Sequence, residues 1–296
     1  MNPKYVLHRT VYRIMHELTL MAGQPFSLDL TLSCGQVFRW EKGSDGWWRG
    51  IVDNNMIRIR QDGEVLRFEG VNRQFIEHYF SLDHDLRAIT ASFDRDPFIH
   101  AAVEQCRGLR LIRQPPWECL ISYICSTNSN IPMIKKRINL MAQAFGDPIE
   151  TDGGTYYGFP KPRSLVGSCA AVLSECKMGY RGGYVKKTAC DITDEREWAR
   201  SISSLPSEDA RKTLMELQGV GPKAADCVLL FAFQKYESFP VDVWIRRIMG
   251  KHYLPNICGS TSLSNREYDA IRKFAKDYFG TYCGYAQEYL FAARED

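Results

Sequence analysis

A short glycine-rich stretch, Leu-Gln-Gly-Val-Gly-Pro-Lys-Ala-Ala-Asp at residues 217–226, constrains the fold of this 296-residue sequence more than any other segment. Apolar residues at helical spacing precede it and predict a helix that ends at Gly219. Pro222 suits the first residue of a second helix, and the apolar character of residues 224–233 predicts that this helix is buried. The sequence therefore predicts two helices joined by a tight Gly-Val-Gly turn.

The predicted turn also indicates a binding partner. The backbone N–H groups of Gly219, Val220 and Gly221 would lie at the positive end of the second helix, where no group of the helix accepts their hydrogen bonds. Such a position binds a phosphate group without regard to base sequence. We therefore expect the turn to contact the backbone of a nucleic acid.

Lys223 and Asp242 are the candidate chemical groups near this turn. Lys223 lies in the first turn of the second helix, where the helix dipole and partial burial favour a neutral amine, which is a nucleophile able to form a Schiff base. Asp242, in the segment Phe-Pro-Val-Asp-Val, could stabilise positive charge on a sugar carbon or assist proton transfer. Two simpler interpretations stay open: the hairpin binds DNA without catalysis, and Asp242 only caps the next helix.

The N-terminal third of the chain carries β-sheet patterns. Apolar and polar residues alternate over residues 26–33, which predicts a half-buried strand. Two further strands are predicted at residues 56–60 and 64–68, with Asp62 and Gly63 as the hairpin turn between them.

The apolar spacing changes to a helical period from Asp96 onward. We therefore expect an α+β fold that begins with a twisted antiparallel β-sheet domain over residues 1–105. An all-helical region, made of two packed subdomains and containing the helix-hairpin-helix motif, is expected over residues 106–296. The functional pocket should lie between the two parts of the chain, because such clefts commonly form at domain interfaces.

Composition sets broad limits on location and partner. A chain of this length with 45% hydrophobic residues can bury a large core, and its net charge of +3 only weakly favours a polyanionic partner. No segment approaches the apolar length of a membrane span, and the N-terminus lacks a convincing secretory signal. We expect an intracellular protein, located in the cytoplasm or nucleoid of a prokaryote or in the nucleus of a eukaryote.

The ten cysteines do not predict a metal centre. They form no Cys-x-x-Cys pair, and none has a histidine at metal-ligand spacing. Only Cys227, Cys258 and Cys283 follow the hairpin, which is fewer than the four that an iron–sulfur cluster requires. We therefore expect that no cofactor is required.

Several segments in the same order along the chain resemble one known family. From about Phe26 to Phe291 the sequence resembles the 8-oxoguanine DNA glycosylases of the eukaryotic type and their bacterial relatives, within the helix-hairpin-helix superfamily. The hairpin and six further segments carry the resemblance: residues 33–40, 79–83, 118–131, 179–181, 241–243 and 286–287. The resemblance implies that Lys223 is the nucleophile and lyase residue and that Asp242 is the second catalytic residue.

Four residues match the base pocket of the resembled family. Cys227 follows Lys223 by one helical turn, and Gln287 and Phe291 share one helix face, so an amide and a ring could bind a base. Without the family, Phe291 is a core residue and Gln287 a surface residue. The resemblance implies instead that Cys227 stacks on the flipped base and that the carbonyl of Gly35 accepts the N7 hydrogen of 8-oxoguanine.

Further matches concern the DNA duplex. The resemblance implies that Asn128 fills the gap left by the flipped nucleotide, and that Tyr180 and Arg181 contact the opposite cytosine. From the residues alone, Asn128 is a helix cap and Tyr180 a partly buried aromatic residue. At two positions the chain departs from the eukaryotic enzymes: Met133 replaces an arginine that contacts the opposite cytosine, and Trp244 replaces a histidine that contacts phosphate. Because Met133 cannot donate hydrogen bonds to the cytosine, we expect a relaxed opposite-base preference.

The resemblance also suggests a structural cation at the hairpin. Backbone carbonyls of Met215, Leu217 and Val220 would bind a monovalent or calcium ion, although carbonyl ligands leave almost no sequence signature. The expected partner is double-stranded DNA containing 8-oxoguanine, with no membrane association, and the protein is expected to act as a monomer.

The predicted reaction is base flipping, attack of the Lys223 amine on C1′ of the sugar, expulsion of 8-oxoguanine, and β-elimination that cuts the strand. A competing hypothesis is a non-catalytic DNA-binding protein that uses the same hairpin. A third hypothesis keeps the enzyme and changes the damaged base to an oxidised pyrimidine.

Overall fold

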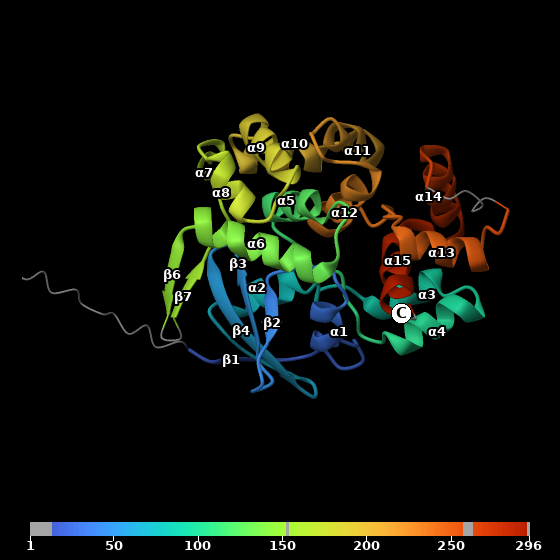
Figure 1. The fold of residues 1–296 in the computed structure, drawn as a ribbon. Helices are drawn as coiled ribbons and strands as arrows, with labels where there is room; N and C mark the ends of the chain where they lie inside the picture. Colours follow the sequence, from blue (N-terminus) through green and yellow to red (C-terminus); the bar gives the residue numbers. More distant parts are fainter. Residues whose placement is uncertain (1–13, 152–153, 257–262, 295–296) are drawn as a thin grey trace, which may run out of the picture.

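Five antiparallel strands form the sheet at the N-terminal end of the chain (Figure 1). This computed structural model describes residues 14–151, 154–256 and 263–294, so Cys258 lies outside the described residues. The strand order is β1-β5-β4-β3-β2, with bounds β1 His16–Thr19, β2 Trp40–Lys42, β3 Trp48–Val52, β4 Asn55–Asp62 and β5 Val65–Glu69. Asp62 pairs with Val65, and Gly63 between them has a φ of 60°. The two strands predicted over residues 56–68 and their turn are therefore confirmed.

The strand predicted at residues 26–33 is wrong, because this segment forms helix α1 (Leu28–Ser33). The Ser27 hydroxyl caps the helix by accepting a hydrogen bond from the N–H of Leu30 at 3.3 Å. Buried Leu28 and Leu32 are four residues apart, a spacing that fits either a strand or a helix. The cap, together with burial of Thr31, selects the helix.

One face of the sheet packs on α2 (Arg73–Tyr79) and α1 in a separate hydrophobic core. This core contains Trp40, Ile59 and Phe68 of the sheet and Phe80 at the end of α2. Among the described residues, its last buried member from the N-terminal region is Phe80, partly buried Leu82 packs against it, and Ile112 is the one buried member from later in the chain. The sheet core therefore ends well before the predicted domain boundary at residue 105.

Helices dominate the remainder of the chain and share a larger core. A two-stranded hairpin that the sequence analysis did not predict, β6 (Pro148–Thr151) and β7 (Gly154–Tyr157), interrupts them. The helices are α3 Leu86–Phe93, α4 Pro97–Gln105, α5 Pro116–Ser126, α6 Ile131–Phe145, α7 Pro162–Val166, α8 Ala170–Glu175, α9 Arg181–Asp191, α10 Glu195–Ser204, α11 Ser207–Met215, α12 Pro222–Phe233, α13 Val243–His252, α14 Asn265–Phe279 and α15 Cys283–Ala292. The α+β architecture with an N-terminal antiparallel sheet is confirmed.

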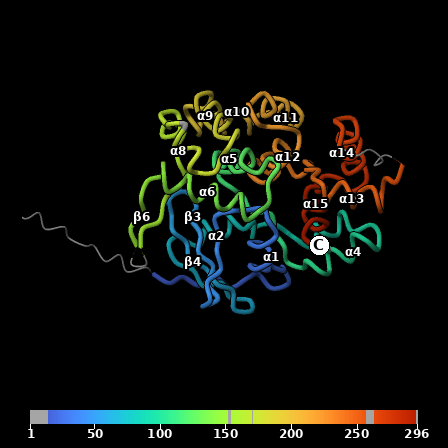
Figure 2. The backbone as a smooth tube through the Cα atoms, viewed as in Figure 1, coloured from blue at the N-terminus to red at the C-terminus, as the bar shows by residue number. Residues whose placement is uncertain are grey.

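The helices form two groups (Figures 1 and 2). Helices α5 to α12 lie above the sheet, whereas α13, α14 and α15 gather beside α3 and α4. Helices α3 and α4 pack on α15 and belong to the larger core, although they precede residue 105. The division into residues 1–105 and 106–296 stays a prediction. Among the described residues, no helix has both the length and the apolar character needed to cross a bilayer.

Candidate active site

The predicted helix-hairpin-helix motif is present as α11, a Gly-Val-Gly turn and α12. Gly219 has a φ of 87°, and a Cβ there would lie 2.6 Å from the Tyr184 ring, so both its conformation and its packing require glycine. Gly221 caps α12, and its carbonyl accepts the N–H of Ala225 at 3.0 Å. The turn therefore presents the N-terminus of a long buried helix at the protein surface.

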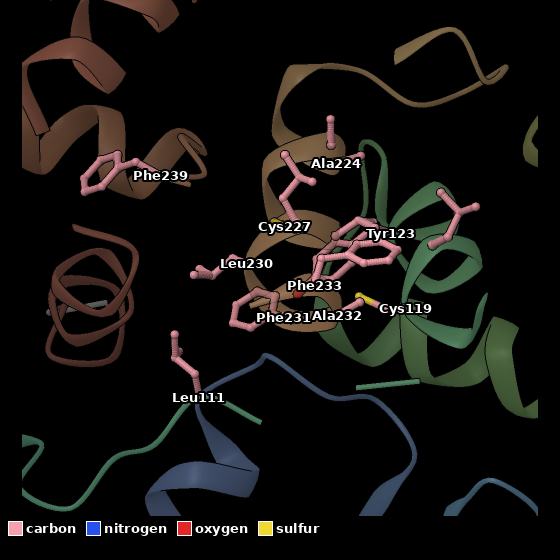
Figure 3. Close-up of a cluster of buried hydrophobic side chains, with 14 of the residues drawn as sticks. Leu111, Cys119, Tyr123, Ala224, Cys227, Leu230, Phe231, Ala232, Phe233 and Phe239 are labelled. Atoms are coloured by element: carbon pink, nitrogen blue, oxygen red, sulfur yellow. The ribbon is translucent and has the colours of Figure 1, made fainter. Parts of the chain in front are cut away.

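Lys223 lies in the first turn of α12 and is half-buried. Its Nζ lies 4.8 Å from the centroid of the Tyr123 ring, which belongs to α5. Figure 3 shows Tyr123 and Cys119 of α5 next to Cys227 and the apolar side chains of α12. Within the described residues, no carboxylate oxygen lies within 4.0 Å of the Lys223 amine, so Lys223 forms no ion pair.

Tyr123 is a site residue to which the sequence analysis gave no role. Its ring is 3% exposed and stacks on Phe231 with 5.9 Å between centroids, which fixes the surface beneath Lys223. Burial raises the pKa of Tyr123 well above its ordinary value, with smaller contributions from neighbouring acidic groups. The phenol therefore stays neutral beside Lys223. Its position in an apolar run just before Asn128 was the only signal in the sequence.

Asp242 is the N-cap of α13, where its Oδ1 accepts the N–H of Ile245 at 2.8 Å. The capping role considered from the sequence is thus present.

The thiol of Cys227 is influenced by both Lys223 and Asp242. Burial raises the pKa of Cys227 to about 12. The positive charge of Lys223 opposes this rise in pKa, and the negative charge of Asp242 adds to it. Both charged groups therefore lie near Cys227 without forming a direct ion pair.

Gly35 and Phe291, which are predicted pocket residues from opposite ends of the chain, lie side by side. Gly35 has a φ of 108°, and a Cβ there would lie 3.0 Å from Cδ1 of Ile131 and 3.6 Å from Cε1 of Phe291. Its backbone can approach this space because it carries no side chain. The structure therefore brings together Gly35, whose carbonyl is predicted to bind the damaged base, and Phe291, whose ring is predicted to stack on it.

Gln287 is buried in α15, not exposed as its residue type alone would suggest. The residue is 5% exposed, and its Oε1 atom has no hydrogen-bond partner among the described residues. Burying an amide oxygen without a hydrogen-bond donor costs free energy. This oxygen is therefore suited to accept a hydrogen bond from a bound ligand.

Glu288 is a second site residue that the sequence analysis missed. It is 3% exposed, and within the part of the chain that the structure describes its Oε1 also has no hydrogen-bond partner. Burial raises its pKa to about 7, Asp242 adds to the rise, and the Cys34 thiol, Arg294 and Lys223 oppose it. Glutamate is rarely fully buried, so its place inside the apolar stretch Tyr-Ala-Gln-Glu-Tyr-Leu-Phe was an available signal.

Two arginines cover the aromatic residues at the edge of the site. The Arg294 guanidinium lies 3.9 Å from the Phe291 ring centroid and 5.9 Å from that of Trp244. Arg247 lies 5.0 Å from the Trp244 ring. Trp244, predicted to take the place of a phosphate-binding histidine, is thus accompanied by two cations that can themselves bind phosphate.

The residues predicted to contact the opposite strand form a connected surface group. Asn128 is exposed, has a φ of 48°, and its Nδ2 donates to the Tyr180 hydroxyl at 3.5 Å. Arg181 is 6% exposed: its guanidinium donates to the carbonyls of Thr127 and Asn128 and lies 4.4 Å from the Tyr180 ring. Arg181 therefore holds the Asn128 turn in place, in addition to any contact with DNA.

The remaining predicted residues lie near these groups. Met133 is half-buried in the first turn of α6, five residues after Asn128. At the hairpin, the carbonyl of Leu217 accepts the N–H of Val220 at 3.1 Å, which leaves one lone pair of that oxygen for another ligand. The proposed cation ligands Met215, Leu217 and Val220 lie at the end of α11 and in the segment that joins it to α12.

Comparisons with known proteins agree on one family. The family model for the N-terminal domain of 8-oxoguanine DNA glycosylases matches residues 19–120. The probable N-glycosylase/DNA lyase of Methanothermobacter thermautotrophicus is 30% identical, with 90% of this chain and 92% of the relative covered. The N-glycosylase/DNA lyase of Saccharomyces cerevisiae is 32% identical, with 88% and 81% covered.

A solved structure shows the same likeness in three dimensions. It is the 8-oxoguanine glycosylase/lyase of Clostridium acetobutylicum in complex with double-stranded DNA that contains cytosine opposite 8-oxoguanine. The two chains superpose with a TM-score of 0.84 at 33% identity, covering 94% of this chain and 96% of the other. The likeness therefore spans nearly the whole of both chains.

Proposed function

This chain belongs to the 8-oxoguanine DNA glycosylase family of the helix-hairpin-helix superfamily, and we propose that it removes 8-oxoguanine from duplex DNA and then cuts the damaged strand. The observation that carries the proposal is the position of Lys223. Its amine lies at the positive end of α12 and on the face of Tyr123, and among the described residues no carboxylate lies within 4.0 Å of it. A lysine amine in this position can act as a nucleophile.

The damaged base would leave the duplex before the reaction, because its sugar carbon is inaccessible inside the stack. In the proposed pocket the base lies between Cys227 and Phe291, with Gln287 at one edge. The Gly35 carbonyl would accept the N7 hydrogen that 8-oxoguanine carries and guanine lacks. The proximity of Gly35 to Phe291 supports this arrangement.

The neutral amine of Lys223 would attack C1′ while the bond from C1′ to the base breaks, and the base leaves with the bonding electrons and takes up a proton. Asp242 would stabilise the positive charge that develops on the sugar. Opening of the sugar ring then gives a Schiff base between Lys223 and C1′. Loss of a C2′ proton expels the 3′ phosphate and cuts the strand, and water releases Lys223.

The duplex would be held by groups on either side of the pocket. The N–H groups of Gly219 and Gly221 suit a phosphate, whereas the N–H of Val220, which was also expected to bind one, is donated to the Leu217 carbonyl. Trp244 would contact a phosphate near the lesion. Asn128 would fill the gap left by the flipped nucleotide, steadied by Tyr180 and Arg181. Met133 offers no hydrogen-bond donor to an opposite cytosine, so we propose a relaxed opposite-base preference.

Further properties follow from the same proposal. We propose that a monovalent or calcium ion binds the carbonyls of Met215, Leu217 and Val220 and stabilises the hairpin, and that catalysis requires no other cofactor. We also propose that the protein acts as a monomer on double-stranded DNA containing 8-oxoguanine, in the cytoplasm or nucleoid of a prokaryote or in the nucleus of a eukaryote.

Borohydride trapping tests the proposed function. A duplex with one 8-oxoguanine should give a covalent adduct with the wild-type protein, because borohydride reduces the Schiff base to a stable amine. Lys223→Gln should give none, whereas Lys212→Gln, a change at a 75% exposed lysine of α11, should give as much adduct as wild type. Binding without an adduct on any lesion would support the non-catalytic hypothesis, and an adduct only with oxidised pyrimidines would support the third.

A further inference from the structure

A buried carboxylate of α12 connects the two groups of helices. Asp226 lies three residues after Lys223, and its side chain is fully buried. Its Oδ1 accepts a hydrogen bond from Nε of Arg211 in α11 at 3.1 Å, and its Oδ2 accepts one from the Tyr268 hydroxyl of α14 at 2.7 Å. Arg272 of α14 forms an ion pair with the same carboxylate at 3.1 Å. Asp226 therefore joins both helices of the hairpin motif to the group that contains α13, α14 and α15.

The Tyr268 hydroxyl extends this connection to the residue before Asp242. It donates to Asp226 and at the same time accepts a hydrogen bond from the backbone N–H of Val241 at 3.2 Å. Val241 directly precedes Asp242, and both Tyr268 and Val241 are buried. One hydroxyl group therefore links the helix that carries Lys223 to the backbone next to Asp242.

The charge of Asp226 strengthens the link. Burial raises the pKa of Asp226 to about 6, and Arg272, Arg211 and the Tyr268 hydroxyl oppose the rise. The carboxylate is therefore mostly ionised at neutral pH, and the hydrogen bond that it accepts from Tyr268 is charge-assisted. Burial also raises the pKa of Tyr268 well above its ordinary value, so the hydroxyl keeps the proton that it donates.

We propose that Tyr268 is a positioning residue that sets the separation of Lys223 and Asp242 through its hydrogen bonds to Asp226 and Val241. The inference rests on the proposed function, which makes this pair the nucleophile and the charge-stabilising group. Lys223 belongs to α12 and Asp242 caps α13, so their separation depends on contacts between the two groups of helices (Figure 1). A displacement of about 1 Å between reacting groups can slow a reaction by about one hundredfold.

Removing the hydroxyl tests this role. Tyr268→Phe keeps the ring and should slow single-turnover excision of 8-oxoguanine by about tenfold to one hundredfold. Its affinity for the same duplex should stay within about threefold of wild type, because the variant keeps every proposed DNA contact. Rates are compared under conditions in which urea unfolding shows each protein to be folded.

The matched control is a second tyrosine of the same helix. The Tyr278 hydroxyl of α14 donates to Oδ2 of Asp96, the N-cap residue of α4, at 3.0 Å. Tyr278→Phe therefore also removes a hydrogen bond between a hydroxyl and a carboxylate, but it leaves the link between Asp226 and Val241 intact. This variant should excise 8-oxoguanine at the wild-type rate.

A double-mutant cycle with Asp242→Asn separates positioning from a general loss of stability. Asparagine also caps helices, so this change removes the charge and keeps the N-cap of α13. If Tyr268 acts through Asp242, Tyr268→Phe should slow excision by less than about threefold in the Asp242→Asn background.

Equal slowing in both backgrounds would overturn the inference while the proposed function stands. If Asp242→Asn shows no excision at all, the two hydroxyl variants decide: a slower rate for Tyr268→Phe alone supports the inference, and equal rates for Tyr268→Phe and Tyr278→Phe overturn it. Absence of excision by wild type would remove the proposed function and the inference together.

Discussion

The Nζ atom of Lys223 lies over the face of the Tyr123 ring, 4.8 Å from its centroid. Tyr123 is in turn fixed by stacking on Phe231 of α12, so helix α5 supplies a rigid surface for a side chain of α12. The electron-rich face of the ring attracts the amine, and the ring itself carries no formal charge. The aromatic ring therefore positions the Lys223 side chain without forming an ion pair with it.

Replacing Tyr123 tests this support. Tyr123→Phe keeps the ring and should keep the rate of abasic-site cleavage within about threefold of wild type, because the cation–π contact needs only the ring. Tyr123→Leu should slow cleavage by about tenfold and lower the free energy of unfolding by about 1–3 kcal/mol. Single-turnover cleavage of an abasic duplex and urea unfolding measure the two effects. Equal rates for all three proteins would show that the ring does not position Lys223.

Gly35→Ala should separate base excision from strand cleavage. The new methyl group would enter the space beside Phe291, so excision of 8-oxoguanine should fall by about tenfold or more, while cleavage of a preformed abasic site should change little. Gly63→Ala is the control, since Gly63 also has a positive φ but no heavy atom within 4 Å of its Cβ position. Equal losses of excision in the two variants would assign the effect to backbone strain and not to the pocket.

Opposite-base preference should depend on residue 133. Wild-type excision rates opposite C, A, G and T should lie within about tenfold of one another, because Met133 offers no donor to discriminate by. Met133→Arg should raise the preference for cytosine. A strong cytosine preference in wild type would contradict the proposal that Met133 relaxes it.

Stability should fall with rising pH because of Glu288. Its pKa is raised from 4.5 to about 7 in the folded protein, so the folded state holds the proton more tightly than the unfolded state. The free energy of unfolding should therefore decrease as the pH rises from 4.5 through 7. Glu288→Gln removes this contribution, and its stability relative to wild type should rise by up to about 3 kcal/mol between pH 5 and pH 8. Chemical unfolding of both proteins at the two pH values measures it; parallel pH dependences would contradict the assignment.

Local chemistry explains which elements could be predicted from sequence. The hairpin was predictable because Gly219 and Pro222 restrict the backbone by themselves. The segment at residues 26–33 was not, because its leucines repeat at a spacing shared by strands and helices, and the Ser27 cap decided the outcome. The β6–β7 hairpin is too short to give a clear alternating pattern.

The site was predictable only in part for a related reason. Lys223 and Asp242 were identified from their places next to the turn and next to a helix start. The identity of a residue does not reveal which way it points, so the buried Oε1 atoms of Gln287 and Glu288, which have no hydrogen-bond partner among the described residues, appeared only in the structure. The same holds for Arg181, whose guanidinium bonds backbone carbonyls that no sequence motif records.

The central claim is that the amine of Lys223 forms the covalent bond to the sugar. The most direct measurement is to reduce the reaction with 8-oxoguanine duplex by borohydride, digest the adduct, and locate the modified residue by mass spectrometry. We predict that the DNA remnant is attached to Lys223 alone, in the peptide that contains the Gly-Val-Gly turn. Attachment to another lysine or to the N-terminal amine of the wild-type protein would contradict the account.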